Sequence, residues 1–308
     1  MGLEWKSVLA KFTKTIFTTM KTFLLLFACV AGIFLPYGHE YTFLIRYLLM
    51  LMLFFSFLDV KIDKNIIRKS HFVILGTIVF VSVAVFLILN QFNNILAQTA
   101  FVTAIAPTAI AAPVIISLKK EKVEFVTFSL LLNNISIALL LPFLLPLLMN
   151  SGGDISVIKV LVPVLIILSV PFAASRLIKL LSHKVWSTLV NWKDSSFYIL
   201  GITVYVAASE ASYYIRSDLT NSFDTVFIIA LISAVLCILF FTLGWFIGGK
   251  EFASEASQSL GQKNNALTIW ISLTFINPIA VLGPVFYVFM QNIYISLQLY
   301  KHRRSCKR

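Results

Sequence analysis

Long apolar runs alternate with short polar segments from one end of the chain to the other. A helix needs about 17 to 25 mainly apolar residues to cross the hydrocarbon core of a bilayer. The pattern predicts ten transmembrane helices, an even number that puts both termini on the same side of the membrane. We expect them at 16–35, 42–58, 71–90, 95–117, 122–149, 155–181, 194–214, 223–248, 251–276 and 280–300.

Composition agrees with this pattern. Hydrophobic residues make up 59% of the 308 residues and charged residues only 12%, with a mean hydropathy of +0.92. Such a chain is typical of a polytopic membrane protein and excludes a soluble domain. We therefore expect an all-α polytopic membrane protein whose main partner is the lipid bilayer. Cys29, Cys237 and Cys306 show no paired or ligand spacing, which predicts neither a disulfide framework nor a metal site.

The basic residues fall mainly on one set of loops. They concentrate in the N-terminal arm, in alternate loops and in the tail 300–308, whereas the opposite loops hold Arg46, Lys159 and Arg216. The positive-inside rule then puts both termini in the cytoplasm, which corresponds to the inner (cytoplasmic) membrane. Topology also accounts for the net charge of +12, so we expect no nucleic-acid partner and interpret the tail as a topology anchor.

Two further segments allow alternatives. Lysines precede the first apolar run, as in a cleaved signal peptide, but the run continues to Leu35 and is long enough to span, so we interpret it as the first helix. The segment 182–193 has the pattern of a short amphipathic helix at the cytoplasmic interface.

The segment 259–267 interrupts the ninth span with polar residues. A lysine at membrane depth costs about 2.5–3.5 kcal/mol on insertion scales, so Lys263 must face protein, water or a ligand. Gly261 and the pair Asn264 and Asn265 are poor residues for a helix interior. We therefore predict a discontinuous helix, with Lys263 as a charged or proton-exchanging group. The alternative is that Lys263 snorkels to an interface.

A matching interruption occurs in the fourth span, where Pro107 and Pro113 each remove a helical hydrogen bond. Pro107 and Gly261 are separated by half the length of the chain. The layout predicts one five-helix repeat in residues 1–150 and a second in residues 151–308. An odd number of spans in each repeat makes the second inverted relative to the first, and paired helix breaks are typical of a transporter site.

Three groups of residues, in this order and spacing, resemble the bile acid:sodium symporter family over essentially the whole chain. They are Ala106-Pro107 with the small residues and basic loop that follow, the run from Gly261 through Leu267, and Pro278 with Gly283-Pro284-Val285-Phe286 and Gln291-Asn292. The resemblance implies a core domain in which discontinuous helices four and nine cross. It also implies a panel domain of spans one, two, six and seven, organic anions between the domains, and sodium ions behind the crossing.

The chain departs from this family at three positions that the resemblance would make ion ligands. Ser259 stands where the family has a glutamate, Lys263 where it has a glutamine, and Pro113 where it has an asparagine. A sodium site needs hard oxygen donors, whereas Lys263 supplies a positive charge of its own. We therefore expect sodium coupling to be weakened or lost, and we predict no other cofactor.

The candidate site is the crossing. The predicted substrate- or ion-binding residues are Lys263, Asn264, Asn265, Gln262, Ser259, Asn133, Asn134, Ser129 and Thr108, and the predicted helix breaks are Pro107, Pro113 and Gly261. Asn264 and Asn265 could instead cap the two half-helices, and Asn133 and Asn134 could serve only as interhelical hydrogen bonds. We expect Glu210 at an interface and expect Glu255 and Gln258 to be solvated.

These observations predict a secondary active transporter of a small organic anion that works by alternating access, with sodium symport as the family default. A sodium-independent or proton-coupled carrier remains open, as does a membrane ligand sensor of the same fold. No H-E-x-x-H, G-x-S-x-G or P-loop motif occurs, so we expect no enzyme and no catalytic residue.

Overall fold

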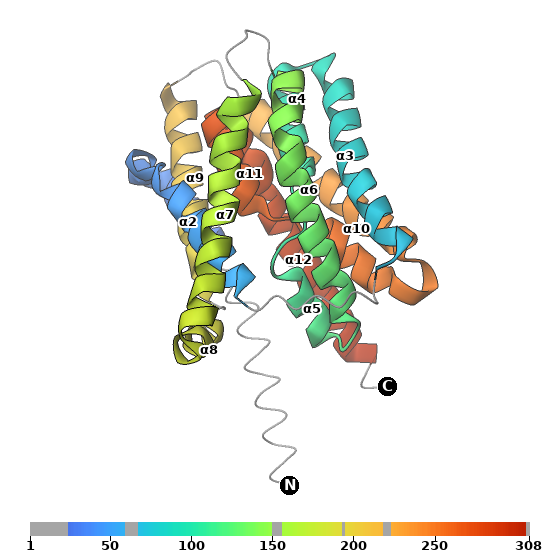
Figure 1. The fold of residues 1–308 in the computed structure, drawn as a ribbon. Coiled ribbons are helices and arrows are strands. Elements are labelled where there is room, and N and C mark those ends of the chain that lie inside the picture. Colours follow the sequence, from blue (N-terminus) through green and yellow to red (C-terminus); the bar gives the residue numbers. More distant parts are fainter. Residues whose placement is uncertain (1–23, 59–66, 150–155, 193–194, 218–222, 306–308) are drawn as a thin grey trace.

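The structure, a computed structural model, describes residues 24–58, 67–149, 156–192, 195–217 and 223–305. Its described residues form helices joined by short connections (Figure 1). In chain order these are a helical segment Leu24–Phe34, η1 (Pro36–Tyr41), α2 (Leu44–Phe57), α3 (Lys69–Asn90), α4 (Asn94–Ala104), α5 (Ala112–Leu118), α6 (Val123–Met149), α7 (Val157–Leu181), α8 (His183–Asn191), α9 (Ser196–Ser217), α10 (Phe223–Gly261), α11 (Asn265–Ile271), the π-helical turn η4 (Ser272–Ile276), η5 (Pro278–Val281) and α12 (Leu282–Ser305).

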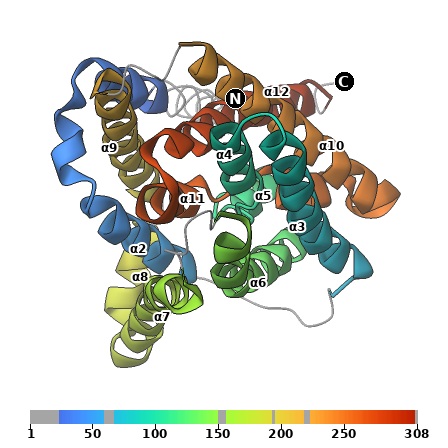
Figure 2. The same cartoon turned by 90° about the horizontal axis from the view of Figure 1, so that it is seen from above.

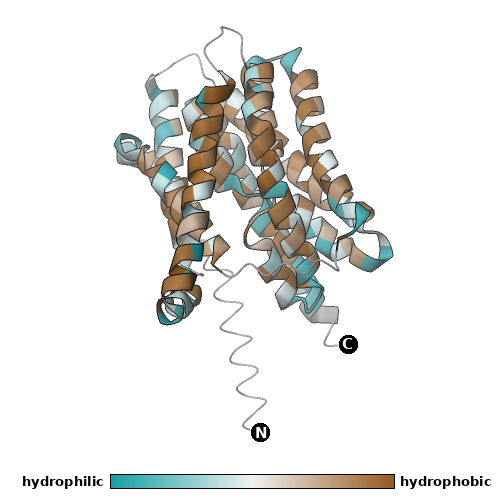
Figure 3. Cartoon of the chain, in the orientation of Figure 1, coloured by the Kyte–Doolittle hydropathy of each residue, from teal (hydrophilic) through white to brown (hydrophobic). Residues whose placement is uncertain are grey.

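The described residues form an all-α membrane protein. Five of the described helical segments are long and apolar enough to cross a bilayer, namely Lys69–Asn90, Val123–Met149, Val157–Leu181, Asp224–Gly261 and Pro278–His302. Figure 3 shows hydrophobic residues along most of the length of these helices, with hydrophilic residues mainly near their ends. A smaller hydrophilic part lies midway along the molecule, between apolar helices.

Most predicted ranges lie close to observed helices, and the breaks predicted at Pro107 and Gly261 are observed. The range 95–117 contains α4 and α5, and the range 251–276 contains the end of α10 followed by α11 and η4. One detail of the prediction is wrong. Pro113 does not interrupt a helix but lies in the first turn of α5. Backbone N–H groups in the first turn make no intrahelical hydrogen bond, so a proline there removes none. The part of the first predicted span before residue 24 lies outside the described residues.

Element α10 contains two helical arms joined at a kink. Gly249 has a φ of 59°, a left-handed conformation that glycine adopts without steric cost, and Phe252 also leaves helical geometry. The two arms pack closely at Gly244, which has no side chain. A Cβ at this position would lie only 2.5 Å from the carbonyl oxygen of Ala256. Ser257 also donates a hydrogen bond of 2.8 Å to the carbonyl of Phe241 on the first arm. The kink therefore folds the second arm back into the interior.

The helices gather into two groups, which Figure 2 shows from one end of the molecule. In one group, α2 contacts α7 and α9, α8 contacts α7, and the segment Leu24–Phe34 and η1 pack on α9. In the other, α3, α4, α6 and α12 surround α10, and α5 packs on α6 and α10. Contacts of α11, η5 and α12 with α2 or α9 join the two groups, and α6 also contacts α7.

The end of α5 contains a strained residue. Lys120 has a φ of 58°, at the position after the helix where glycine is usual. The amide of Lys120 donates to the carbonyl of Ser117, and the amide of Glu121 donates to the carbonyl of Ile116. These two bonds form the Schellman arrangement that closes a helix C-terminus. The lysine side chain is exposed, so its Cβ gains no packing that offsets the strain.

We therefore expect Lys120→Gly to stabilise the protein. A non-glycine residue in this conformation costs about 1 kcal/mol, which corresponds to a rise of roughly 2 °C in Tm for a chain of this size. Thermal unfolding of the detergent-purified protein measures the shift. Lys120→Ala is the matched control, because alanine removes the long side chain but keeps the Cβ that causes the strain. Equal Tm values for the two variants would contradict the explanation.

Candidate functional site at the helix crossing

The two helix breaks cross each other and pair through their main chains. The amide of Ala109 donates to the carbonyl of Gln262, and the amide of Asn264 donates to the carbonyl of Pro107, both at 2.7 Å. Thr108 and Lys263 thereby form an antiparallel β-bridge, the one isolated bridge among the described residues. Helix ends leave backbone groups without intrahelical partners, and such groups are costly when buried. At the crossing, each break supplies hydrogen-bond partners for some of the unpaired backbone groups of the other break.

Thr108 connects three elements at the crossing. Its hydroxyl donates to the carbonyl of Ser259 at 2.5 Å and accepts a hydrogen bond of 2.8 Å from the Asn133 side chain of α6. The Nδ2 atom of Asn134 donates to the Thr108 carbonyl at 2.9 Å, and its Oδ1 atom accepts a hydrogen bond of 3.4 Å from Nδ2 of Asn264. Asn133 and Asn134 of α6 are therefore brought together with Thr108 of the first break and Asn264 of the second.

Lys263 is buried and does not snorkel. Its residue is 1% exposed, and Nζ donates a 3.0 Å hydrogen bond to the carbonyl of Ala104, the last residue of α4. Nζ also lies 3.8 Å from the centre of the Phe240 ring. A helix C-terminus and an aromatic face both attract positive charge. Lys263 forms no salt bridge with a described acidic residue, so these neutral groups are its electrostatic partners.

Several buried oxygens at the crossing and on the adjacent face of α6 lack hydrogen-bond donors. Within the described part of the chain, no donor reaches the side-chain oxygens of Ser129, Asn133, Gln262 and Asn265. A buried acceptor without a partner costs about 1–3 kcal/mol. Ser129 and Asn133 are four residues apart on α6, so they share one helix face. The arrangement therefore has unused capacity to accept hydrogen bonds or to coordinate a hard cation.

The capping alternative fails for the asparagine pair. Asn264 occupies the residue before α11, but its side chain makes no capping hydrogen bond. The Asn265 amide instead donates to the carbonyl of Lys263 at 3.2 Å, within the break itself. Both side chains are thus directed to groups of the crossing rather than to free amides of α11.

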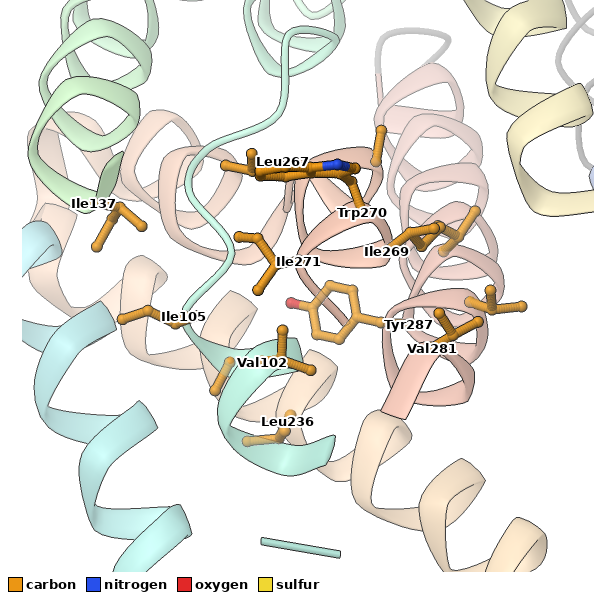
Figure 4. Close-up of a cluster of buried hydrophobic side chains, with 14 of the residues drawn as sticks. Val102, Ile105, Ile137, Leu236, Leu267, Ile269, Trp270, Ile271, Val281 and Tyr287 are labelled. Carbon is orange, nitrogen blue, oxygen red and sulfur yellow. The ribbon is translucent and has the colours of Figure 1, made fainter. Parts of the chain in front are cut away.

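Sequence reasoning missed three residues that hold the second break in place. Gln291 on α12 accepts the backbone N–H of Lys263 at 3.0 Å, and the hydroxyl of Tyr287, one helical turn earlier, donates to the carbonyl of Gly261 at 2.7 Å. Figure 4 shows Tyr287 among buried apolar side chains of α4, α10 and α11. Phe240 contributes its ring to Lys263. The pair Gln291-Asn292 was a visible signal, but the neighbour Asn292 bonds only to Val288 of its own helix.

The prediction that Glu255 and Gln258 are solvated is wrong. Glu255 is 5% exposed, and its carboxylate accepts the backbone N–H of Lys122 at 3.1 Å. Gln258 is fully buried and donates to the side chain of Gln298 at 2.6 Å. The kink at Gly249 is the physical reason, because it turns this arm of α10 inward.

Glu210 does not join the crossing. It is half-buried in α9, in the group of helices that contains η1. The neighbouring Tyr213 ring stacks on His39 of η1 with 4.0 Å between ring centres.

Comparison with known proteins gives no identification: no protein-family model matches the sequence, and no curated protein matches it.

Proposed function

We propose that the protein is a secondary active transporter of a small organic anion, with ten transmembrane helices in two inverted five-helix repeats. Both termini are cytoplasmic in this proposal, and the membrane is the inner one. Residues 1–150 form the first repeat and residues 151–308 the second. The crossing of α4–α5 with α10–α11 is the binding region, as in the bile acid:sodium symporters that the motifs resemble.

The observation that carries the proposal is the concentration of buried polar groups at the crossing of an otherwise apolar molecule. The side-chain oxygens of Asn133, Gln262 and Asn265 remain without donors at the crossing that contains the buried Lys263, and Ser129, one turn earlier on α6, also lacks a partner. Polar groups at membrane depth are expensive and are typical of substrate and ion pathways. A hydroxyl- or amine-bearing substrate would supply the missing donors.

The charge at the crossing favours an anionic substrate. No described carboxylate forms a salt bridge with Lys263, so the region carries an uncompensated positive charge when the amine is protonated. A positive potential in a low-dielectric surrounding attracts anions over a long range. Lys263 Nζ already contacts Ala104 and Phe240. It would therefore attract the substrate through its electrostatic potential rather than through a direct contact.

The two helix groups are the moving units of the proposed mechanism. The crossing is bonded internally by buried hydrogen bonds, so the α3–α6 and α10–α12 group moves as one body. Its contacts with the other group come mainly from α11, η5 and α12 against α2 and α9, and from α6 against α7. Rocking about these contacts would expose the crossing alternately to the two sides of the membrane.

Lys263 favours a carrier that does not require sodium. In the family that the motifs resemble, a sodium ligand stands at the position of Lys263. Here the lysine ammonium donates to the carbonyl of Ala104 at the C-terminus of α4, and a helix C-terminus favours a cation. The unpartnered oxygens nearby are neutral, and the carboxylate of Glu255 accepts the amide of Lys122. These residues do not fit a sodium ion at the lysine position. A proton-coupled or uncoupled carrier is therefore the form of the proposal that we favour.

Thermal unfolding and uptake test this function together. We first expect that a panel of organic anions, including taurocholate and hydroxylated carboxylates, contains members that raise the Tm of the purified protein, because a ligand bound only to the folded state stabilises it. Vesicles that contain the protein should then accumulate such an anion at the same rate in sodium and in potassium buffers.

Lys263→Gln provides the matched comparison for the ion. It removes the resident charge and restores one of the three family ligands, so we expect a sodium-specific rise in Tm, if either protein shows one, only in the variant. A sodium-specific rise in the wild type would contradict the role given to Lys263. If no anion in the panel shifts the Tm and none enters the vesicles, the transporter assignment is contradicted.

A further inference from the structure

Helix α8 lies across the end of α7, at the end of the molecule that also carries α5 and the last turns of α12 (Figure 1). Ser182 separates the two helices. Its backbone is extended, which ends α7, and its side chain caps the N-terminus of α8. Its hydroxyl oxygen accepts the backbone N–H of Val185 at 3.3 Å. The short helix is therefore a separate element and not a frayed end of α7.

The residues of α8 divide cleanly between two faces. At 100° per residue, one side of the helix is polar and the other apolar. The polar side carries His183, Lys184, Ser187, Thr188 and Asn191, and the apolar side carries Val185, Trp186, Leu189, Val190 and the following Trp192. None of the residues of α8 is fully buried, so the apolar side is only partly covered by the described protein.

Trp186 fixes α8 to the rest of the structure. Its indole N–H donates a 2.8 Å hydrogen bond to the carbonyl of Leu58, just after α2. The ammonium of Lys179 on α7 lies 5.1 Å from the centre of the same indole ring. The orientation of α8 is therefore set by contacts at both α2 and α7, and its exposed side faces in a defined direction.

Exposed apolar side chains and cations lie next to each other at this corner. Leu180, Leu181 and Trp192 are 84%, 75% and 63% exposed. Lys179 and Lys184 are exposed beside them, and Arg176 lies one turn earlier on α7. The whole stretch 156–192 contains no aspartate or glutamate. Apolar residues that enter a bilayer interface next to uncompensated cations are the features that bind an anionic membrane surface.

We propose that α8 and the last turn of α7 form a binding surface for anionic phospholipids, with α8 lying in the plane of the membrane interface. The apolar side packs among acyl chains, and Arg176, Lys179 and Lys184 bind the phosphate headgroups. This inference is independent of the proposed transport function, because it uses no residue of the crossing.

Lipid competition tests the surface. Quenching of tryptophan emission by brominated lipids, in mixed micelles with the full-length protein, gives the binding constant of phosphatidylglycerol relative to phosphatidylcholine. Each surface cation contributes a factor of about five to the binding of an anionic lipid surface. We expect a ratio well above one for the wild type, and a ratio near one for the triple variant Arg176→Gln, Lys179→Gln, Lys184→Gln.

A second triple variant controls for net charge. Lys120→Gln, Lys250→Gln and Lys301→Gln remove three exposed lysines outside α7 and α8, so they change the charge of the protein equally. We expect this control to keep the wild-type ratio, and we expect inorganic phosphate not to compete. Equal losses in both triple variants, or an unchanged ratio in the first, would overturn the proposal.

The readout also separates a protein partner from a lipid. If the apolar side of α8 instead seals a contact with a second copy of the chain, Leu181→Gln with Val185→Gln would change the mass of the particle in light scattering. The lipid ratio would then stay at its wild-type value in the cation variant, and the proposal would be wrong.

Discussion

Lys263→Glu is expected to destabilise the protein strongly, whereas Lys263→Met is expected to lower the Tm much less. The lysine nitrogen lies against the carbonyl oxygen of Ala104 and the face of Phe240. Both groups present negative partial charge and would repel a carboxylate. An uncompensated buried charge of this kind costs about 3–5 kcal/mol. Methionine has a similar volume and avoids the cost of burying an amine, so its main loss is the hydrogen bond to the Ala104 carbonyl, about 1–3 kcal/mol.

Thermal unfolding at two pH values measures this contrast. A glutamate at position 263 must take up a proton to remain among these groups, so the loss of Tm should be larger at pH 8 than at pH 5. The methionine variant is the control for size and should show no such dependence beyond that of the wild type. If the glutamate variant is as stable as the methionine variant at pH 8, the surroundings of Lys263 do not select a cation. Greater stability of the methionine variant together with lost uptake would mean that Lys263 is retained for function.

Thr108→Val is expected to lower the free energy of unfolding by about 2–6 kcal/mol. Valine keeps the shape of threonine but removes the hydroxyl that binds the Ser259 carbonyl and the Asn133 amide. Ser259 lies in the last turn of α10, where carbonyls lack helical donors, so its oxygen would be buried without a partner. Each buried group left unpaired costs about 1–3 kcal/mol.

Thr203→Val is the matched control for this substitution. Thr203 is equally buried, but its hydroxyl bonds only to the carbonyl of Ile199 four residues earlier in α9, which keeps its helical donor. We expect a loss well under that of Thr108→Val. Chemical denaturation in detergent, followed by circular dichroism, compares the two variants. Similar losses would show that the hydroxyl of Thr108 has no special part in holding the crossing.

The apolar pattern was sufficient to locate most helices and both breaks, because each depends on local chemistry. Gly261 and Lys263 are conspicuous within an apolar run, and proline at position 107 cannot supply a helical N–H. Pairing of the breaks could not be predicted in atomic detail, since Ala109 and Gln262 meet only through main-chain groups that every sequence carries. Where the chain folds back, the position of a residue along a predicted helix also gave a wrong prediction of its burial.

Glu255 is the clearest case of such an error. Charged residues near the end of a span are usually solvated, and nothing local distinguishes this one. Its burial follows from the kink at Gly249 and from the distant amide of Lys122, both tertiary features. Tyr287 escaped notice for the same reason, because a tyrosine in an apolar helix has no local signal that its hydroxyl reaches Gly261.

The main-chain pairing between 107–109 and 262–264 has a consequence for how such a protein can evolve. The two bonds require an N–H at Ala109 and at Asn264 but no particular side chain there. Substitutions around them can therefore accumulate while the scaffold persists, and the chemistry at its centre can drift separately from its architecture. A lysine could enter such a place by a single replacement, and the lineage would not have to pass through an unfolded ancestor.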